Sequence, residues 1–244
     1  MSFYRCHSNS DAKMPLSGLR SLPYRAMCSK LFSRSWQDIF ERHLFFSRAF
    51  SFLAFNEISG DYLEFGCHQC RTFVMAYKES RRRWLTTRLW AFDSFQGLPA
   101  ASGAKDWHPG WTPGAMAMSQ EQFHQKCKRA GISESEYRVV PGFYNESLPG
   151  IGQGEEPQDV CLAYIDCDMY SSTREVLRFL MPRLKHGMII AFDDWFTWSA
   201  KELSGEQMAF DECFQGQTLW RFHRYLPIGW HGVSFIVERI SEKI

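Results

Sequence analysis

The 244-residue sequence has almost no excess of charge of either sign. Its 28 Lys and Arg residues face 27 Asp and Glu residues, which gives a formal net charge of +1. A near-neutral chain offers no long-range attraction for nucleic acid or for an anionic membrane surface. No segment approaches the roughly 18 uncharged apolar residues that a membrane-spanning helix needs. We therefore expect a small-molecule partner, and neither nucleic acid nor a membrane.

The N-terminal stretch lacks the apolar segment and small-residue cleavage site of a secretory signal. The eight cysteines are scattered, and several lie in apolar runs where a free thiol behaves as a small hydrophobic group. Cys67 and Cys70 form a C-x-x-C motif, but no second such pair completes a zinc site. A thioredoxin-type redox site remains an alternative for these two thiols. The pattern suits a reducing environment, and we expect a cytoplasmic location.

Internal repeats and low-complexity tracts are also absent, and the length suits one sizeable α/β domain with an extension. Residues 1 to about 35 show no sustained periodicity, which predicts an irregular arm. Between Ser35 and Phe55 apolar residues recur at helical spacing, which predicts one or two amphipathic helices. We expect an N-terminal arm and helical extension over residues 1–57 and the main domain over residues 58–244.

After Gly60 the sequence contains short apolar runs separated by segments of helical periodicity. Such alternation predicts right-handed crossovers and a mostly parallel sheet. Ser172 and Glu175 have the spacing of a capping box, and Pro182 should kink or end the helix that follows. Two final runs without a helix between them predict an antiparallel ending. We expect strands at 61–66, 88–94, 137–142, 160–167 and 187–194, helices at 71–84, 119–130 and about 205–214, and the final runs at 218–225 and 234–240.

The turn after the first predicted strand, LEFGCHQC, contains an acid and a glycine before a helix. Such a turn resembles a nucleotide-binding loop, in which the backbone approaches a ligand closely at Gly66. It is not G-x-G-x-x-G, so a pyrophosphate-bearing ligand is disfavoured. Asp93 ends the second strand, where folds of this kind hold a ribose through its hydroxyls. A ribose without a phosphate cradle points to S-adenosylmethionine, although a helix N-cap role for Asp93 is an equal alternative.

Two buried strands end in pairs of acids, which is unexpected because an unpaired buried charge is costly. Asp166 and Asp168 follow one strand, and Asp193 and Asp194 follow the next. If Asp166, Asp193 and Asp194 converge, their oxygens suit Mg²⁺ better than Ca²⁺ or Mn²⁺ and disfavour zinc. Asp168 is then placed to act as a general base on a bound hydroxyl. The alternative is that Asp194 caps the next segment and Asp168 begins a turn.

These segments resemble the class I S-adenosylmethionine-dependent methyltransferases, and among them the macrocin O-methyltransferases (TylF type) of natural-product sugars. The resemblance runs from about Gly60 to Phe214, with a fainter match at GVSFIVER. It rests on GDYLEFGCHQCRTF, WAFDSFQGLP, SQEQFHQKCKRAGI, RVVPGFYNESLP, IDCDMYSSTREVLRFLMPRLKHG and FDDW. The combination of D-S-F-x-G-L-P with D-x-D-x-Y-x-S-T and a later D-D is far more specific than any single acid.

The resemblance implies a Rossmann-like, seven-stranded, mostly parallel sheet with an antiparallel C-terminal strand and helices on both faces. It implies S-adenosylmethionine and Mg²⁺ as cofactors, and a homodimer or larger assembly. Cys70 departs from the family pattern, which often has a small glycine there, and Trp195 stands where Tyr is more usual. The implied roles are cofactor binding by Glu64, Gly66, Thr72, Asp93, Ser94, Gly142, Phe143 and Asp166, metal binding by Asp166, Asp193 and Asp194, and general-base catalysis by Asp168.

The sequence thus predicts a metal-dependent O-methyltransferase that acts on a hydroxyl of a sugar, a glycosylated natural product or a polysaccharide. A catechol-like acceptor is the nearest alternative, since the same metal geometry would hold two phenolic oxygens. A non-catalytic domain that binds S-adenosylmethionine or a partner is the alternative from a different class. The aromatic-rich loop of residues 106–118 is long enough to form a lid over an acceptor. His108 in this loop is not assigned a catalytic role.

Overall fold

The computed structural model describes residues 34–240 except residues 153, 199 and 201. The predicted irregular arm lies almost entirely outside the described residues. The chain divides into two compact units, residues 1–38 and 39–244, and the sheet belongs to the second. The segment for which one or two helices were expected forms one helix, α2 (Arg34–Phe55).

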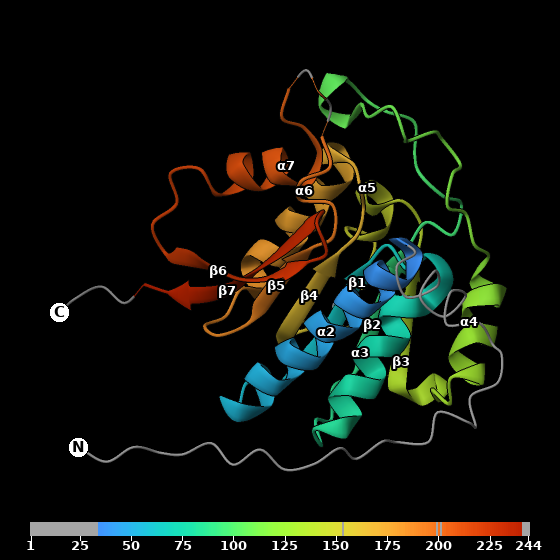
Figure 1. The fold of residues 1–244 in the computed structure, drawn as a ribbon, viewed down its shortest axis with the longest axis vertical. Coiled ribbons are helices and arrows are strands. Elements are labelled where there is room, and N and C mark those ends of the chain that lie inside the picture. The colour runs from blue at the N-terminus through green and yellow to red at the C-terminus, as the bar shows by residue number, and fades with distance from the viewer. Residues whose placement is uncertain (1–33, 153, 199, 201, 241–244) are drawn as a thin grey trace, which may run out of the picture. The chain divides into compact units, whose positions relative to one another are not determined.

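A seven-stranded sheet runs through the described part of the chain in the order β3-β2-β1-β4-β5-β7-β6 (Figure 1). Strands β1 to β5 are parallel, whereas β7 runs antiparallel to both β5 and β6. The predicted mostly parallel sheet with an antiparallel ending is therefore confirmed. The strands are β1 (Asp61–Phe65), β2 (Leu89–Asp93), β3 (Tyr137–Pro141), β4 (Val160–Ile165), β5 (Ile189–Phe192), β6 (Trp220–Ile228) and β7 (Gly232–Arg239).

The burial of each strand follows its position in the sheet. Every residue of β4 and β5 is buried, as expected for central strands of a parallel sheet that are covered on both faces. The edge strand β6 instead mixes exposed and half-buried residues before its buried last residue, Ile228, which matches its more polar sequence. The continuous apolar runs therefore mark the centre of the sheet, and the acids that follow them lie at its carboxyl edge.

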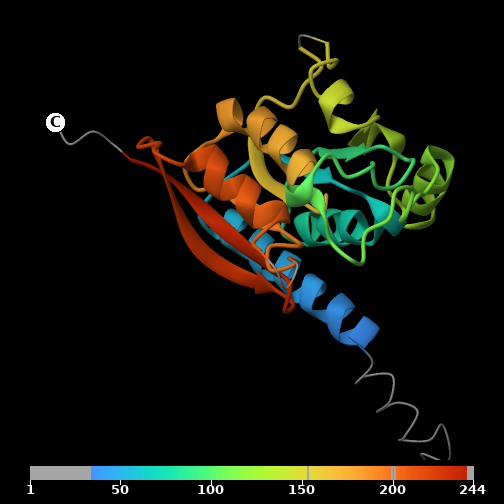
Figure 2. The same cartoon turned by 90° about the horizontal axis from the view of Figure 1, so that it is seen from above.

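Helices cover both faces of the sheet, as Figure 2 shows. Residues of α2, α3 and α4 share one apolar cluster with the sheet, and residues of α5, α6 and α7 share the other. None of the described helices is both long and apolar enough to cross a membrane. The bounds are α3 (Arg71–Arg82), α4 (Gln120–Arg129), α5 (Tyr144–Ser147), α6 (Tyr170–Leu180) and α7 (Gly205–Phe214).

The start of α6 differs from the prediction. The helix begins at Tyr170 rather than after Ser172, and Met169 at its N-cap makes no side-chain capping bond. The missing acceptor comes from a distant loop, because Asp106 accepts a hydrogen bond from the backbone N of Ser171 at 2.7 Å. The predicted capping box was wrong because local spacing carries no information about a capping group from so far along the chain. The helix gives way to a 3₁₀ turn at Met181–Arg183, which contains the proline that was expected to end it.

Candidate active site

Four neighbouring parallel strands end at the same edge of the sheet. They end in register, with Phe65 paired to Phe92 and to Ile165, and Ile165 paired to Phe192. The residues that follow these positions form a row along the edge, namely Gly66, Asp93, Asp166 and Asp193. In open parallel sheets, ligands bind outside this edge. Residues predicted from four separate motifs are therefore brought together.

Three acids form a cluster after β4 and β5. One carboxylate oxygen each from Asp166, Asp168 and Asp194 lie within 4.8 Å of one another. Burial and the charge of Asp193 raise the pKa of Asp166 well above the usual range, and burial and the charge of Asp194 do the same for Asp168. Burial and the charge of Asp193 raise the pKa of Asp194 to about 6. Three crowded carboxylates that repel one another are a donor set suited to a hard divalent cation.

Asp193 is turned to different partners. Arg42 on α2 binds it with two bonds, from Nε to Oδ1 at 3.1 Å and from Nη2 to Oδ2 at 2.5 Å. The hydroxyl of Tyr164 also donates to Oδ1. Burial opposes the charge on Arg42, but Asp193 and Tyr164 raise the pKa of its guanidinium above the ordinary value. The structure thus places Asp166 and Asp194 in one cluster with Asp168, and holds Asp193 beside them in an ion pair.

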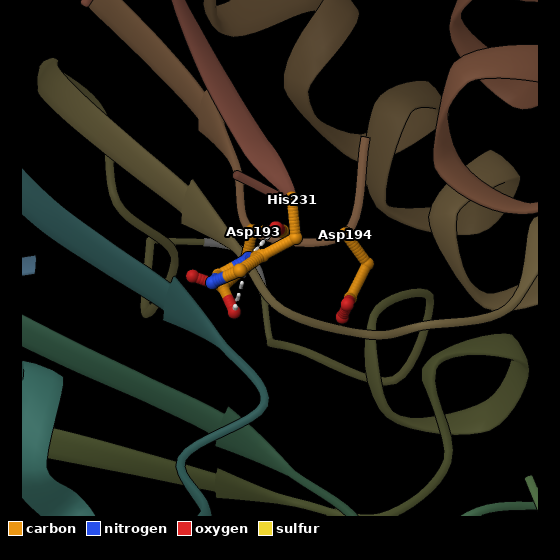
Figure 3. A group of neighbouring side chains, drawn as sticks. All are labelled: Asp193, Asp194 and His231. Carbon is orange, nitrogen blue, oxygen red and sulfur yellow. Dashed lines mark hydrogen bonds and ion pairs between the residues drawn. The ribbon is translucent and has the colours of Figure 1, made fainter. Parts of the chain in front are cut away.

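His231 in the turn between β6 and β7 directs its ring toward Asp193, and Asp194 lies beside this pair (Figure 3). Its Nδ1 is 2.5 Å from the backbone oxygen of Asp193, which can only accept, so Nδ1 carries the donated proton. One ligating atom each from His231, Asp193 and Asp194 lie within 4.8 Å of one another. The sequence motifs contained no signal for His231 or Arg42, because each of these residues contacts Asp193 from a distant part of the chain.

Glu206 in the first turn of α7 joins the two acid-bearing loops. This fully buried carboxylate accepts from the backbone N of Cys167 at 3.3 Å and from that of Asp194 at 2.9 Å. Cys167 lies between Asp166 and Asp168, so one side chain fixes the backbone of both loops. The sequence contains no signal for a role of α7 at the site, since a lone Glu near a helix start is ordinary.

Replacing Glu206 with Gln should lower both stability and turnover, because one of the two backbone N–H groups then faces an amide NH₂. A buried donor without a partner costs about 1–3 kcal/mol. We expect Glu206→Gln to lose about that much stability and Glu206→Ala to lose more, as measured by urea unfolding. Glu202→Gln, at an exposed position nearby, is the control. Equal stability of Glu206→Ala and wild type would show that the two bonds are not formed.

Glu64 is fully buried at the end of β1, where the sequence placed a cofactor residue. Its carboxyl group accepts from the hydroxyl of Tyr62 and, at 2.9 Å, from Thr72 Oγ1. Burial raises the pKa of Glu64 to about 8 despite these two bonds. Glu64 and Thr72, both predicted to bind the cofactor, are therefore directly bonded to each other.

This raised pKa predicts a pH-dependent stability. The folded state holds the Glu64 proton up to a pKa of about 8, whereas the unfolded value is 4.5, so stability falls as pH rises between these values. Glu64→Gln removes the ionisation, so its stability relative to wild type should rise by about 4 kcal/mol between about pH 5 and pH 9. Thermal unfolding at a series of pH values measures this. A constant difference across the series would contradict the raised pKa.

Two predicted cofactor glycines have structural reasons to be glycine. Gly66 has φ +91°, and a Cβ there would lie 1.8 Å from the backbone oxygen of Asp166. The close approach at Gly66 is thus to the neighbouring strand end. Gly142 has φ +119°, and its N donates to the backbone oxygen of Asp93 at 3.0 Å. Phe143 follows as the half-buried N-cap of α5.

Asp93 organises two loops at the same edge. Its Oδ2 accepts from the backbone N of Cys67 and its Oδ1 from that of Phe95, each at 2.6 Å. Ser94 Oγ donates to the backbone oxygen of Gly97 at 2.9 Å. Asp93 thus holds the backbone of two turns and does not occupy the N-cap of a described helix, and its predicted ribose contact stays a prediction.

The C-x-x-C thiols do not form a redox pair. Cys67 and Cys70 are both buried, and Cys70 Sγ lies 3.6 Å from Cys127 Sγ on α4. Burial raises the pKa of Cys67, and the contact with Cys127 together with burial raises that of Cys70. Reactive redox thiols instead have lowered pKa values and some exposure. The structure therefore gives these cysteines a packing role.

The loop of residues 106–118 is attached to the helices beside the acid cluster. Asp106 is buried and accepts from Ser102 and Ser171, and these bonds lower its pKa although burial opposes them. Lys105, just before the loop, forms an ion pair of 2.6 Å with Glu212 on α7. Trp111 lies close to Gly205, since a Cβ on that glycine would be 3.6 Å from its ring. The predicted lid role remains a prediction.

The strand order, the helices on both faces and the ligand edge define a Rossmann-like class I methyltransferase fold. The model of the macrocin-O-methyltransferase (TylF) family matches residues 41–208, more than half of the chain. The chain belongs to this family.

Individual relatives agree with this assignment. The chain is 30% identical over 149 residues to 8-demethyl-8-(2,3-dimethoxy-alpha-L-rhamnosyl)-tetracenomycin-C 4'-O-methyltransferase of Streptomyces olivaceus, covering 57% of this chain and 54% of that protein. It is 26% identical over 164 residues to mycinamicin III 3''-O-methyltransferase of Micromonospora griseorubida, covering 59% of each. The chain thus spans about half the length of the curated relatives it matches.

Solved structures share the fold at low sequence identity. The O-methyltransferase NovP superposes with a TM-score of 0.65 at 19% identity, covering 82% of this chain and 80% of that one. The calicheamicin methyltransferase CalS11 gives a TM-score of 0.63 at 19% identity, covering 88% and 86%. The predicted architecture is confirmed by these matches.

Proposed function

We propose that the protein is an S-adenosylmethionine- and Mg²⁺-dependent O-methyltransferase that methylates a hydroxyl of a sugar, a glycosylated natural product or a polysaccharide. The observation that carries the proposal is the cluster of Asp166, Asp168 and Asp194 at the ligand edge of this fold. Family membership supports the reaction, and the rhamnosyl acceptor in the name of the Streptomyces olivaceus relative supports the acceptor class. Residues 58–244 form the methyltransferase domain in this proposal.

S-adenosylmethionine supplies a methyl group on a sulfonium, and the proposed binding residues lie at or after the ends of β1, β2, β3 and β4. Thr72 donates a hydrogen bond to Glu64, and Asp93 accepts one from the backbone N of Cys67 in the turn after β1. Asp93 thereby ties the end of β2 to the turn after β1, which fixes the loop that would contact the cofactor. We assign cofactor binding to this network, with Gly66, Ser94, Gly142, Phe143 and Asp166.

When bound, Mg²⁺ would lower the pKa of an acceptor hydroxyl and fix its direction. Asp166, Asp193 and Asp194 are the proposed ligands, and Asp168 is the proposed general base. A sugar hydroxyl is a poor nucleophile near neutral pH, so transfer requires an acceptor for its proton. Asp168, with a pKa raised by burial and by Asp194, can hold that proton within the cluster.

The test is a methyl-transfer assay with a panel of rhamnosides, other glycosides and catechols. Transfer to a glycoside, its loss on adding EDTA and its recovery with excess Mg²⁺ are the expected results. Activity that is indifferent to chelation would remove the metal from the proposal, and a preference for catechols would replace the acceptor class. Cofactor binding in calorimetry with no transfer to any acceptor would favour a non-catalytic domain.

We also propose a homo-oligomer. The aromatic side chains of Phe40 on α2 and Trp230 in the β6–β7 turn are 64% and 80% exposed, and such apolar surface is available for a contact between subunits. Sedimentation equilibrium tests the proposal, and a monomer at all concentrations would refute it.

A further inference from the structure

Two helices of this protein begin with the same capping-box sequence, S-x-x-Q, but only one box is closed. In α4, Ser119 Oγ accepts from the backbone N of Gln122 at 3.1 Å, and Gln122 Oε1 accepts from that of Ser119 at 3.0 Å. In α7, Ser204 occupies the N-cap and Gln207 lies three residues further on, yet Ser204 makes no capping bond. The α7 box is therefore open.

The open box leaves two polar atoms without partners. Ser204 is 2% exposed. Ser204 Oγ and Gln207 Oε1 are the two buried side-chain atoms that have no hydrogen-bond partner among the described residues. A buried polar atom without a partner is costly, and native structures usually satisfy such atoms with protein, water or a ligand.

The backbone explains why this box does not close. Gly205, the first residue of α7, has φ +63°, so the chain is not helical where it leaves Ser204. Glu206, the next residue, accepts hydrogen bonds from the backbone N atoms of Cys167 and Asp194. Because these two hydrogen bonds and the positive φ of Gly205 set the path of the first turn, they hold the side chains of Ser204 and Gln207 apart from their usual capping partners.

The open box is next to the proposed base. A Cβ on Gly205 would lie 3.2 Å from the backbone oxygen of Asp168 and 3.6 Å from Cη2 of Trp111. Gly205, which lies between Ser204 and Glu206 in the chain, thus packs against the loop that carries Asp168. An aromatic ring from the loop of residues 106–118 covers the same place.

The two atoms select a neutral hydroxyl. Gln207 Oε1 requires a donor, and the Ser204 hydroxyl can donate or accept. A hydroxyl satisfies both, whereas a carboxylate or phosphate oxygen offers no proton to Gln207 Oε1. The ring of Trp111 suits the apolar C–H face of a sugar. We propose that Ser204 and Gln207 bind a hydroxyl of the acceptor other than the one methylated, an inference that rests on the proposed function.

The test uses Ser204→Ala and Gln207→Met, with Ser119→Ala in the closed box of α4 as the matched control. The acceptor is the glycoside methylated fastest in the panel described above. Each site variant should raise the KM for that glycoside about fivefold to tenfold, as expected for one lost hydrogen bond to a neutral group. The KM for S-adenosylmethionine and kcat should stay within about twofold of wild type, because the lost contact is to the acceptor in both ground and transition state.

Thermal unfolding separates a binding role from a capping role. Ser204→Ala should leave the Tm unchanged or raise it, since Ser204 makes no capping bond and its buried hydroxyl has no partner, whereas Ser119→Ala should lower the Tm. If Ser204→Ala lowers the Tm as Ser119→Ala does and leaves the acceptor KM unchanged, the α7 box is closed in solution and the inference is wrong.

Monodeoxy analogues of the same glycoside identify the bound hydroxyl. Removing that hydroxyl should raise the KM of wild type but have little further effect in Ser204→Ala, because the same contact is already lost. Additive effects for every analogue would overturn the inference while leaving the proposed function intact. Failure of wild type to methylate any hydroxyl acceptor would overturn the proposed function, and this inference with it.

Discussion

Replacing Asp168 with Asn should lower kcat by about a hundredfold or more while leaving the binding of S-adenosylmethionine unchanged. A positioned general base contributes about 10²–10⁴-fold, and an amide cannot take up the hydroxyl proton. Asp168 has φ +62°, a conformation that Asn adopts more readily than most residues. The substitution therefore preserves the backbone and removes the proton acceptor from the cluster.

Steady-state kinetics gives the loss in kcat, and calorimetry with S-adenosylhomocysteine gives cofactor affinity. Asp211→Asn, at an exposed position on α7, is the matched control and should behave as wild type. Wild-type turnover in Asp168→Asn would refute the base assignment. A parallel loss of cofactor affinity would instead assign Asp168 to cofactor binding.

The sheet could be predicted from the sequence because its signals are local. Buried central strands such as β4 are continuous apolar runs, and they end where an acid follows, as at Asp166. Parallel strands place their carboxyl ends at one edge, so the row containing Asp93, Asp166 and Asp193 followed from strand assignment alone. The acid motifs therefore predicted correctly which acids the sheet brings to its carboxyl edge, and their roles there stay predictions.

The contacts that arrange the site could not be predicted, because they are between residues far apart in the chain. Arg42 and Asp193 are 151 positions apart, and a basic residue on an amphipathic helix ordinarily predicts a solvent-exposed face. Asp106 caps α6 from 65 positions away, in place of the local Ser172. The open box of α7 has the same sequence pattern as the closed box of α4, and only the path set by Gly205 and Glu206 distinguishes them.

Breaking the Arg42–Asp193 ion pair should cause a large loss of stability. Arg42→Met keeps an extended side chain but removes the charge, which leaves the 2%-exposed Asp193 without its cationic partner. Breaking a buried ion pair from one side costs about 3–5 kcal/mol. Arg42 is 19% exposed, so we expect the lower end, about 3 kcal/mol, or a fall in Tm of about 6–12 °C for a protein of this size. Calorimetric unfolding in EDTA measures it.

Arg82→Met is the matched control, because Arg82 also binds a buried carboxylate, that of Glu79. Arg82 is 63% exposed, and Glu79 retains Arg83 at 2.6 Å, so the control should lose less than about 1 kcal/mol. Equal losses of stability in Arg42→Met and Arg82→Met would show that the Arg42–Asp193 pair stabilises the fold no more than the exposed Arg82–Glu79 pair does.

The same variant tests whether Asp193 is a metal ligand. A cation bound by Asp193 competes with Arg42 for the same two oxygens, since both are occupied by the guanidinium. Arg42→Met should then gain more in Tm than wild type when EDTA is replaced by excess Mg²⁺, because the metal no longer displaces an ion pair. If Mg²⁺ raises both Tm values equally, Asp193 serves as the partner of Arg42, and the metal is held by Asp166, Asp168 and Asp194.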